Sequence, residues 1–508
     1  MESFRGLDAA VIGAGHNGLA CAALLARQGL SVAVFEAGER IGGAAVSEPV
    51  WDGYTVSTAS YVCTLLDPWL IETLGLERRG YSAYRKDPAT FNVLADGRSL
   101  LLGSDDAQND REIAAFDPRD APAFRALDAH IRDLGSALFD TFSDEQPRFN
   151  RFAPEIRRDL LGSAAAIAER YVRTPVLGAA IATDGIIGTY LGPRDPGTGY
   201  VLAHHYAGRA LGVQGAWGYV RGGMGSISKA LAAAATEHGA RIVTQQRVTR
   251  ILVEDGKAAG IVLEDGAQVR ARVVASNAHP RTTFLDLAGS EHLAPDFVRR
   301  VQEWKTIGAA MKINFAIAEL PNFTCRPSAA PAPHHRATIH VAPSIDYIQE
   351  ACDTARATGI SERPMLECFL QTPTDSSLAP EGKHILSVFA QYYPYDRKGG
   401  WSSQTREAAA DRVVEILGEF APNLPGAVEA RQILTPVDLE SRFGLTGGHI
   451  FHGELLPGQI YDDRFAARTP LENLYLCGSG THPGGCVSGF PGKRAAGAIL
   501  ADLQVQAR

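Results

Sequence analysis

A glycine-rich turn near the N-terminus constrains the fold more than any other feature of this sequence. Residues 13–18 read Gly-Ala-Gly-His-Asn-Gly, directly after an apolar strand expected over 9–12 and before an Ala/Leu-rich helix expected to end near Gly29. The first glycine permits a tight turn, the second lets the backbone approach a diphosphate, and the third lets the helix pack on the strand. A second strand over 32–35 completes a βαβ unit, which favours a doubly wound parallel sheet.

The residues after the second strand indicate which dinucleotide is bound. Glu36 ends that strand, 18 residues beyond Gly18, where a carboxylate can accept hydrogen bonds from ribose hydroxyls. The alternative is that Glu36 merely ends the strand. Residues 36–43 fit Glu-x-x-x-Arg-x-Gly-Gly, an extension that a simple NAD dehydrogenase does not need. The paired glycines allow a second close approach to the longer FAD diphosphate, and Arg40 can neutralise it. The predicted cofactor is therefore FAD, with these contacts near the N-terminus: Gly13, Gly15, His16, Asn17, Gly18, Glu36, Arg40, Gly42 and Gly43.

The length and the alternation of elements predict two joined domains. A chain of 508 residues is too long for one core. Arg- and Asp-rich helical stretches, such as 123–139 and 155–171, interrupt the α/β pattern, and β-rich runs follow Lys305. We expect an α/β fold with a Rossmann-type FAD-binding domain and a discontinuous α+β substrate domain of helices and an antiparallel sheet. The FAD-binding domain is assigned to 1–105, 215–292 and 431–508, and the substrate domain to 106–214 (helical) and 293–430 (sheet).

Individual strands and helices are predicted from apolar periodicity and from turn residues. After the first βαβ unit, a helix ending at His238 and a helix over about 489–503 are expected. The remaining strands are predicted over 241–243, 248–253, 259–263, 273–275, 311–317, 338–341, 365–371, 384–393 and 474–477.

Composition and charge exclude several classes of function. The net charge of -8 is spread along the chain, and no basic stripe indicates a nucleic-acid partner. The seven cysteines show neither a C-x-x-C pair nor zinc spacing, so no metal is expected. Apolar runs are too short for a membrane span, and the N-terminus lacks the order of a secretory signal, which favours a cytoplasmic location.

A second glycine-rich motif lies near the C-terminus. Residues 474–485 read Leu-Tyr-Leu-Cys-Gly-Ser-Gly-Thr-His-Pro-Gly-Gly, and 489–492 continue with Gly-Phe-Pro-Gly. With the N-terminal motif, this resembles the phytoene-desaturase-like flavoproteins, a branch of the flavin amine oxidase superfamily that includes carotenoid desaturases and ketolases. The resemblance implies that the tail passes over the flavin and that a helix then points at its pyrimidine end. It implies flavin contacts at Gly478, Ser479 and Val487, and an adenine contact at Val248, although Val248 is equally explained as an ordinary strand valine.

The segment 448–453, Gly-His-x-x-His-Gly, is similar to the subgroup of pyridine nucleotide-disulfide oxidoreductase domain-containing proteins. A true disulfide reductase needs a redox cysteine pair and a second dinucleotide motif. The sequence contains neither, so NAD(P)H is not the expected reductant.

Four residues are candidates for catalysis. Lys312 interrupts an apolar strand, and the resemblance implies that it holds a water at the flavin, as in amine-oxidising relatives; the alternative is an edge-strand lysine facing solvent. His482 either donates to the flavin or substrate or only pins its loop. His452 and Glu454 lie two residues apart, on one face if the segment is extended, and form an acid/base pair or a structural hydrogen bond.

Three further features carry weaker hypotheses. Cys486 stands where relatives usually have glycine, which suggests either a covalent flavin link or tolerance of a small side chain. The pairs His204-His205 and His334-His335 lack acidic or cysteine partners at ligand spacing, so loop or surface positions are expected for them.

The resemblance implies an FAD-dependent oxidoreductase that transfers a hydride from a largely apolar, lipophilic small molecule to the flavin. Oxygen or a quinone is the expected electron acceptor. Peripheral membrane contact through an apolar patch in 106–214 or 293–430 is a further expectation, and the oligomeric state is left open. Two alternatives are a flavin amine oxidase and a flavin-binding structural or assembly protein without turnover.

Overall fold

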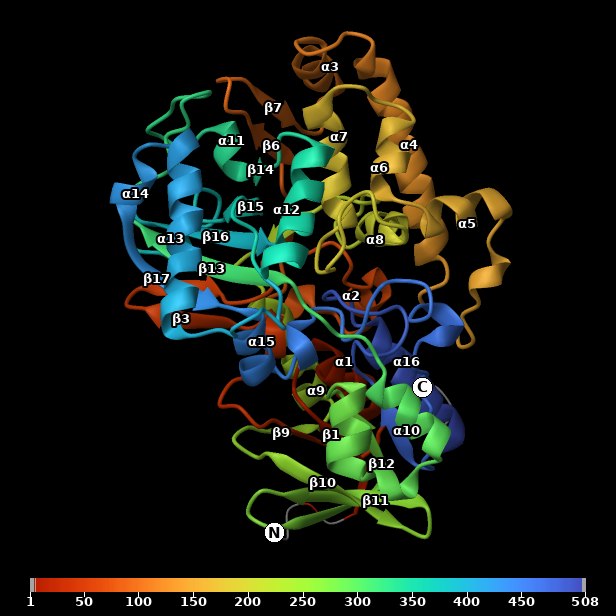
Figure 1. The fold of residues 1–508 in the computed structure, drawn as a ribbon. Coiled ribbons are helices and arrows are strands. Elements are labelled where there is room, and N and C mark those ends of the chain that lie inside the picture. The colour runs from red at the N-terminus through yellow and green to blue at the C-terminus, as the bar shows by residue number, and fades with distance from the viewer. Residues whose placement is uncertain (1–3, 5, 505–508) are drawn as a thin grey trace.

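The computed structural model describes residue 4 and residues 6–504, which fold around two sheets and a group of helices. In Figure 1 the first sheet lies in the lower half, the second sheet at upper left, and the helices of the 106–205 segment at upper right. The predicted α/β class, with a Rossmann-like sheet and a largely antiparallel second sheet, is confirmed.

The first sheet begins as the sequence predicts. Strand β1 (Leu7–Ile12) pairs in parallel with β2 (Val32–Phe35), and α1 (His16–Arg27) connects them. On the other side β1 pairs in parallel with β12 (Gln268–Ser276), which also pairs with β18 (Leu474–Leu476). The carboxyl ends of β1, β12 and β18 therefore meet at one edge of the sheet, where open α/β sheets bind their ligands. Strand β9 (Arg241–Val243) extends the sheet beyond β2, and β10 (Val248–Glu254) and β11 (Lys257–Leu263) extend it beyond β12.

Three helices in this half of the molecule are tightly packed. Helix α1 packs in one apolar core with α9 (Gly225–Glu237) and α16 (Phe490–Asp502). A Cβ atom on Gly492 of α16 would lie 2.2 Å from the carbonyl oxygen of Asn17 in α1. This glycine therefore lets the last helix of the described chain lie directly against the first.

The second sheet is built from segments far apart in sequence. Its strands in spatial order are β17 (Val428–Leu434), β13 (Ala310–Ile317), β16 (His384–Gln391), β15 (Met365–Leu370), β14 (Thr338–Val341), β6 (Thr90–Val93) and β7 (Ser99–Leu102). Strand β14 pairs with β6 in parallel, and the other pairs are antiparallel.

The division into five segments stays a prediction, but one boundary does not match the strand pairing. Strands β6 and β7 lie within the segment 1–105 that was assigned to the FAD-binding domain, and they belong to the second sheet. The backbone of β6 bonds to β14, so the chain crosses to the second sheet before residue 105. Local periodicity cannot reveal this, because the partner strand is about 250 residues away.

The predicted helix over 155–171 is two helices. Helix α5 (Pro154–Leu161) ends at Gly162, and the Ser163 hydroxyl accepts a hydrogen bond from the Ala166 N–H to start α6 (Ala164–Glu169). A serine cap directly after a glycine interrupts a pattern that otherwise has continuous helical period. Within the described residues, no helix is both long and apolar enough to cross a membrane.

Candidate functional site

A large cavity lies between the two sheets. Its volume is about 1360 Å³, beyond the roughly 300–1,000 Å³ of ordinary small-molecule pockets. Its walls come from the glycine turn after β1, the loop after β12, the C-terminal loop, the second sheet and α4 (Asp120–Phe139). The volume is sufficient for a dinucleotide together with a second molecule.

The glycine turn forms one end of this cavity. Gly13 has φ +90°, a left-handed conformation that favours glycine, and a Cβ atom on Gly18 would lie 2.2 Å from the Gly13 carbonyl oxygen. Helix α1 starts at His16 without a side-chain cap. Its first N–H groups therefore remain free for an anion, as expected for a phosphate-binding helix terminus.

Most predicted cofactor residues line the cavity. The lining positions are Gly13, Gly15, His16, Asn17, Glu36, Arg40, Gly42, Gly43, Val248, Ser479 and Val487. Gly18 and Gly478 do not line it. Gly18 packs against Gly13, and Gly478 packs against Asn277, so these two glycines support the wall from behind.

The two ends of the chain are joined by hydrogen bonds at this site. Asn17 Nδ2 donates to Ser479 Oγ over 3.1 Å. Glu36 receives the Ala14 N–H on Oε2 and the Gly38 N–H on Oε1, each over 2.8 Å. A carboxylate has about four lone-pair sites, so Glu36 keeps acceptor capacity for ribose hydroxyls.

Three histidines at this end are neutral. His16, His279 and His452 line the cavity, and each has one ring nitrogen that is buried without a hydrogen-bond partner. Burial lowers the pKa of His16 to about 4 and that of His452 to about 3, and it lowers the pKa of His279 well below its ordinary value. Buried polar atoms without partners are rare, so these nitrogens suit hydrogen bonds to a bound cofactor.

The sequence analysis did not identify Asn277, His279 or Arg281, which line the same end. They follow β12, which pairs in parallel with β1. A strand over 273–275 was predicted, and the residues after a parallel strand reach the same edge as the glycine turn. The signal was therefore present in the sequence.

The predicted pair of His452 and Glu454 does not form. The His452 ring faces that of His279, with centroids 5.5 Å apart, and its φ of +55° breaks the extended geometry the pairing needed. Glu454 is absent from the cavity lining; its Oε2 lies 3.3 Å from His449 Nε2.

His482 is also outside the lining: it is buried against Tyr461, and its Nε2 lies 3.2 Å from the Thr141 carbonyl oxygen. This geometry favours the loop-pinning alternative for His482.

Lys312 is a buried lysine that faces the cavity. Its strand β13 is bonded on both sides, so the alternative of an edge-strand lysine in solvent is wrong. Its Nζ donates to Asn314 Oδ1 over 2.6 Å and to Ser387 Oγ over 2.9 Å, and lies 4.9 Å from the Tyr61 ring centre. Burial lowers the pKa of Lys312 to about 7, so a neutral amine is accessible near physiological pH.

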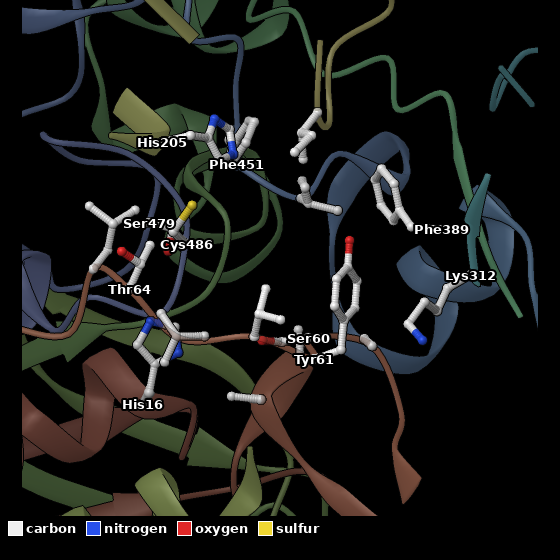
Figure 2. Close-up of a pocket in the computed structure, with 18 of the residues that line it drawn as sticks. His16, Ser60, Tyr61, Thr64, His205, Lys312, Phe389, Phe451, Ser479 and Cys486 are labelled. Carbon is white, nitrogen blue, oxygen red and sulfur yellow. The ribbon is translucent and has the colours of Figure 1, made fainter. Parts of the chain in front are cut away.

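Aromatic rings cover the second-sheet side of the cavity. The Tyr61 ring centre lies 4.3 Å from that of Phe369 and 6.1 Å from that of Phe389. In Figure 2 Tyr61, Phe389 and Lys312 lie on one side of the space, and His16, Thr64, Ser479 and Cys486 on the other. The sequence analysis missed these rings, because they come from a loop and two strands that only the fold brings together.

Cys486 lines the cavity with φ +74°, the left-handed region that favours glycine. This conformation suits the glycine that the resemblance implies at that point. Burial raises the pKa of its thiol to about 12, which disfavours the thiolate that a covalent link needs.

The expectation of surface histidines is wrong at both pairs. His204 and His205 are buried in α8 (Thr198–His205), and His334 and His335 are buried in α11 (Pro333–Arg336). His205 stacks on Trp217, with ring centres 5.7 Å apart, and also lines the cavity. The apolar helix α8 has no exposed face, because other elements of the helical segment cover it.

Comparison with known proteins supports a shared ancestry over the whole chain. "Pyridine nucleotide-disulfide oxidoreductase domain-containing protein 2" of Rattus norvegicus is 39% identical over 98% of this chain and 94% of its own length. A hydroxyneurosporene desaturase of Cereibacter sphaeroides is 28% identical over 98% of both chains. The structure of cyclohexylamine oxidase from Brevibacterium oxydans has a similar fold, with a TM-score of 0.62, 19% identity, and coverage of 98% of this chain and 99% of that chain.

The family model described as "Flavin containing amine oxidoreductase" matches residues 18–500. That match includes most of the helix after the glycine turn, both sheets except strand β1, and the C-terminal loop. The chain therefore belongs to the flavin containing amine oxidoreductase family.

Proposed function

We propose that this protein is an FAD-dependent oxidoreductase that removes a hydride from an organic substrate held between the nucleotide end of the cavity and the second sheet. One observation carries the proposal. The phosphate-binding turn, the C-terminal loop and the buried Lys312 open into the same cavity of about 1360 Å³. Family membership supports a flavin as the cofactor.

The residues at the nucleotide end fit FAD. The free N–H groups at the start of α1 and the paired Gly42 and Gly43 suit a diphosphate, and Arg40 adds a positive charge. Glu36 suits the adenosine ribose and Val248 the adenine. Ser479 and Val487, at the other end of the chain, would hold the flavin ring. The unpartnered nitrogens of His16, His279 and His452 would find hydrogen-bond partners on the same molecule.

Bound FAD supplies the acceptor for a hydride. The protein would hold the substrate against it in a space lined on the side of the second sheet by Tyr61, Phe369 and Phe389. Neutral Lys312 would accept a proton from the substrate or from a water held by its amine.

Oxidation of a carbon–carbon bond is the first candidate reaction, and amine oxidation is the second. The latter is favoured by Lys312 beside the Tyr61 ring, since a lysine that is partly neutral near pH 7 tolerates a nearby substrate ammonium. Oxygen or a quinone is the proposed final electron acceptor. Peripheral contact of the protein with a membrane, from which a lipophilic substrate would enter the cavity, remains a prediction.

The spectrum of the purified protein tests the proposal. The expected result is a yellow protein, or a colourless one that becomes yellow with FAD and not with NAD. Anaerobic mixing with aromatic and alicyclic compounds, with and without amino groups, is then expected to bleach the yellow band for one class. A protein that binds no flavin under any condition would contradict the proposal. A yellow protein that no compound bleaches would support the alternative of a structural flavoprotein.

A further inference from the structure

A row of four side chains crosses the second sheet along the cavity. Lys312 on β13 lies opposite Phe389 on β16, which lies opposite Glu367 on β15, which lies opposite His340 on β14. Directly opposed residues share one face of a sheet, and all four line the cavity. Neighbouring strands are about 4.8 Å apart, so the backbone of Glu367 lies roughly 10 Å from that of Lys312. Along this wall of the cavity, an aromatic ring therefore lies between a lysine and a carboxylate.

Further charged groups gather around the Glu367 end. Asp184 and Lys86 line the cavity there, from the helical segment and from the connection before β6. Burial and then the Glu367 carboxylate raise the pKa of Asp184 to about 8, and burial lowers that of Lys86 to about 8. The groups are therefore close enough to affect one another. Glu367 and Lys86 are buried, and Asp184 is partly buried.

These groups do not satisfy one another. Glu367 is only 5% exposed, and its Oε2 has no hydrogen-bond partner; His340 Nε2 lies 3.7 Å from it. Its Oε1 is 3.5 Å from the Tyr61 hydroxyl, the limit for a hydrogen bond. Lys86 donates to the Thr338 hydroxyl instead of a carboxylate. Within residues 6–504, no side chain or backbone group is hydrogen-bonded to the Asp184 carboxylate.

A buried carboxylate without donors is costly, which makes a purely structural role a poor explanation for this arrangement. The cavity wall formed by α4 is charged as well, through Arg125, Asp128 and Arg132. Those α4 side chains are already paired, Arg125 with Asp110 and Arg132 with Asp128. A hydrocarbon would leave the Glu367 and Asp184 carboxylates without a hydrogen-bond donor. The unpaired groups in this part of the cavity are hydrogen-bond acceptors, so a ligand group that matches them is a hydrogen-bond donor.

We propose that Glu367 and Asp184 form a head-group subsite that binds a hydrogen-bond-donating group, a hydroxyl or an ammonium, at the end of the substrate away from its reacting bond. This rests on the proposed function and narrows it. The substrate has an apolar body, which lies on Phe389 and Tyr61, and a polar donor at one end. The polar end narrows the largely apolar substrate that the family resemblance implies.

The test is anaerobic calorimetric binding to the flavin-loaded protein with four matched probes. They are phenethylamine, phenethyl alcohol, 3-phenylpropanoate and ethylbenzene. The first or second is expected to bind at least roughly tenfold more tightly than the other two, the factor for one hydrogen bond to a charged group. Tightest binding of the carboxylate or the hydrocarbon overturns the proposal.

Variants locate the subsite. Glu367→Gln and Asp184→Asn are each expected to remove this tenfold preference while the flavin spectrum is unchanged. The control is Asp120→Asn, a buried carboxylate outside the cavity that accepts the backbone N–H groups of Arg173 and Thr174. It is expected to keep the preference. If Glu367→Gln does not fold, the probe affinities of Asp184→Asn alone test the subsite.

The two proposals fail in different ways. A protein that never acquires flavin contradicts the proposed function. A flavin-loaded protein whose probe affinities are the same in the wild type and in both variants contradicts only the head-group subsite.

Discussion

Asn17 and Ser479, which are 462 positions apart, share a hydrogen bond of 3.1 Å between Nδ2 and Oγ. Asn17 lies in the first turn of α1, and Ser479 follows β18, the strand that joins the first sheet through β12. The cofactor end of the cavity is therefore closed only when both ends of the chain are folded. Binding of the cofactor and packing of the C-terminal segment are expected to stabilise each other.

The glycine turn predicts that Gly18→Ala loses the cofactor. The new Cβ would lie 2.2 Å from the Gly13 carbonyl oxygen, so the turn must shift away from the diphosphate. We expect at least a roughly tenfold lower affinity for FAD, measured by fluorescence titration of the apoprotein. The control is Gly497→Ala in α16, where nothing lies within 4 Å of the added atom. It is expected to keep FAD and to be neutral or slightly stabilising. Equal affinity in both variants would be inconsistent with this view of the turn.

Lys312 predicts a specific dependence of stability on pH. Its pKa is about 7 in the folded protein and 10.5 ordinarily, so between these values the unfolded chain binds a proton that the folded protein does not. Below pH 7 the burial of this lysine lowers the free energy of unfolding by its largest amount, and this loss of stability becomes smaller as the pH rises toward 10.5. The free energy of unfolding of the wild type, relative to Lys312→Met, is therefore expected to rise between pH 7 and pH 10. At about 1.4 kcal/mol per pKa unit, the rise is at most about 5 kcal/mol.

Urea unfolding of both proteins at pH 7 and pH 9.5 measures this difference. The exposed Lys305 provides the control, since Lys305→Met is expected to change stability equally at the two pH values. A difference between wild type and Lys312→Met that is the same at both pH values would show that Lys312 is charged in the folded protein at pH 7.

Arg464 predicts a large loss of stability on substitution. Its buried guanidinium donates to the carbonyl oxygens of Phe451, Glu454, Gln459, Ser479 and Thr481. Arg464→Met leaves these acceptors unpaired, and we expect a loss of about 3 kcal/mol or more in denaturant unfolding. Arg464→Lys is expected to recover little, because one ammonium has three donors and no fork. The exposed Arg299 is the comparison: Arg299→Met is expected to change stability by less than about 0.5 kcal/mol. A small effect of Arg464→Met would mean that water reaches these carbonyls.

From the burial and backbone conformation of Cys486 we predict that the flavin is not covalently bound and that glycine is more stable than alanine at this position. Because burial raises the pKa of the thiol to about 12, we expect acid precipitation to release the yellow colour into the supernatant. The φ of +74° costs a residue with a Cβ about 1 kcal/mol or more. Cys486→Gly is thus expected to be more stable than Cys486→Ala by about that amount. Colour that stays with the precipitate would establish a covalent link instead.

The sequence by itself determined the nucleotide half of the protein. The glycine turn, Glu36 and the strands over 32–35 and 241–243 are set by local rules: a fixed spacing of glycines, and an apolar period that changes between helix and strand. The C-terminal motif was equally readable, because glycines and a strand again lie close together in sequence. For these segments, the residues that define the structure are neighbours along the chain.

Only the tertiary structure decided the other half of the cavity. Glu367, Asp184 and Lys86 come from three distant segments, and no spacing links them. The predicted pair of His452 and Glu454 does not form, because the backbone at His452 is left-handed and not extended, and Glu454 lies beside His449 instead. Which face of a strand points into a cavity depends on the register of its partners, and these lie as much as 250 residues away.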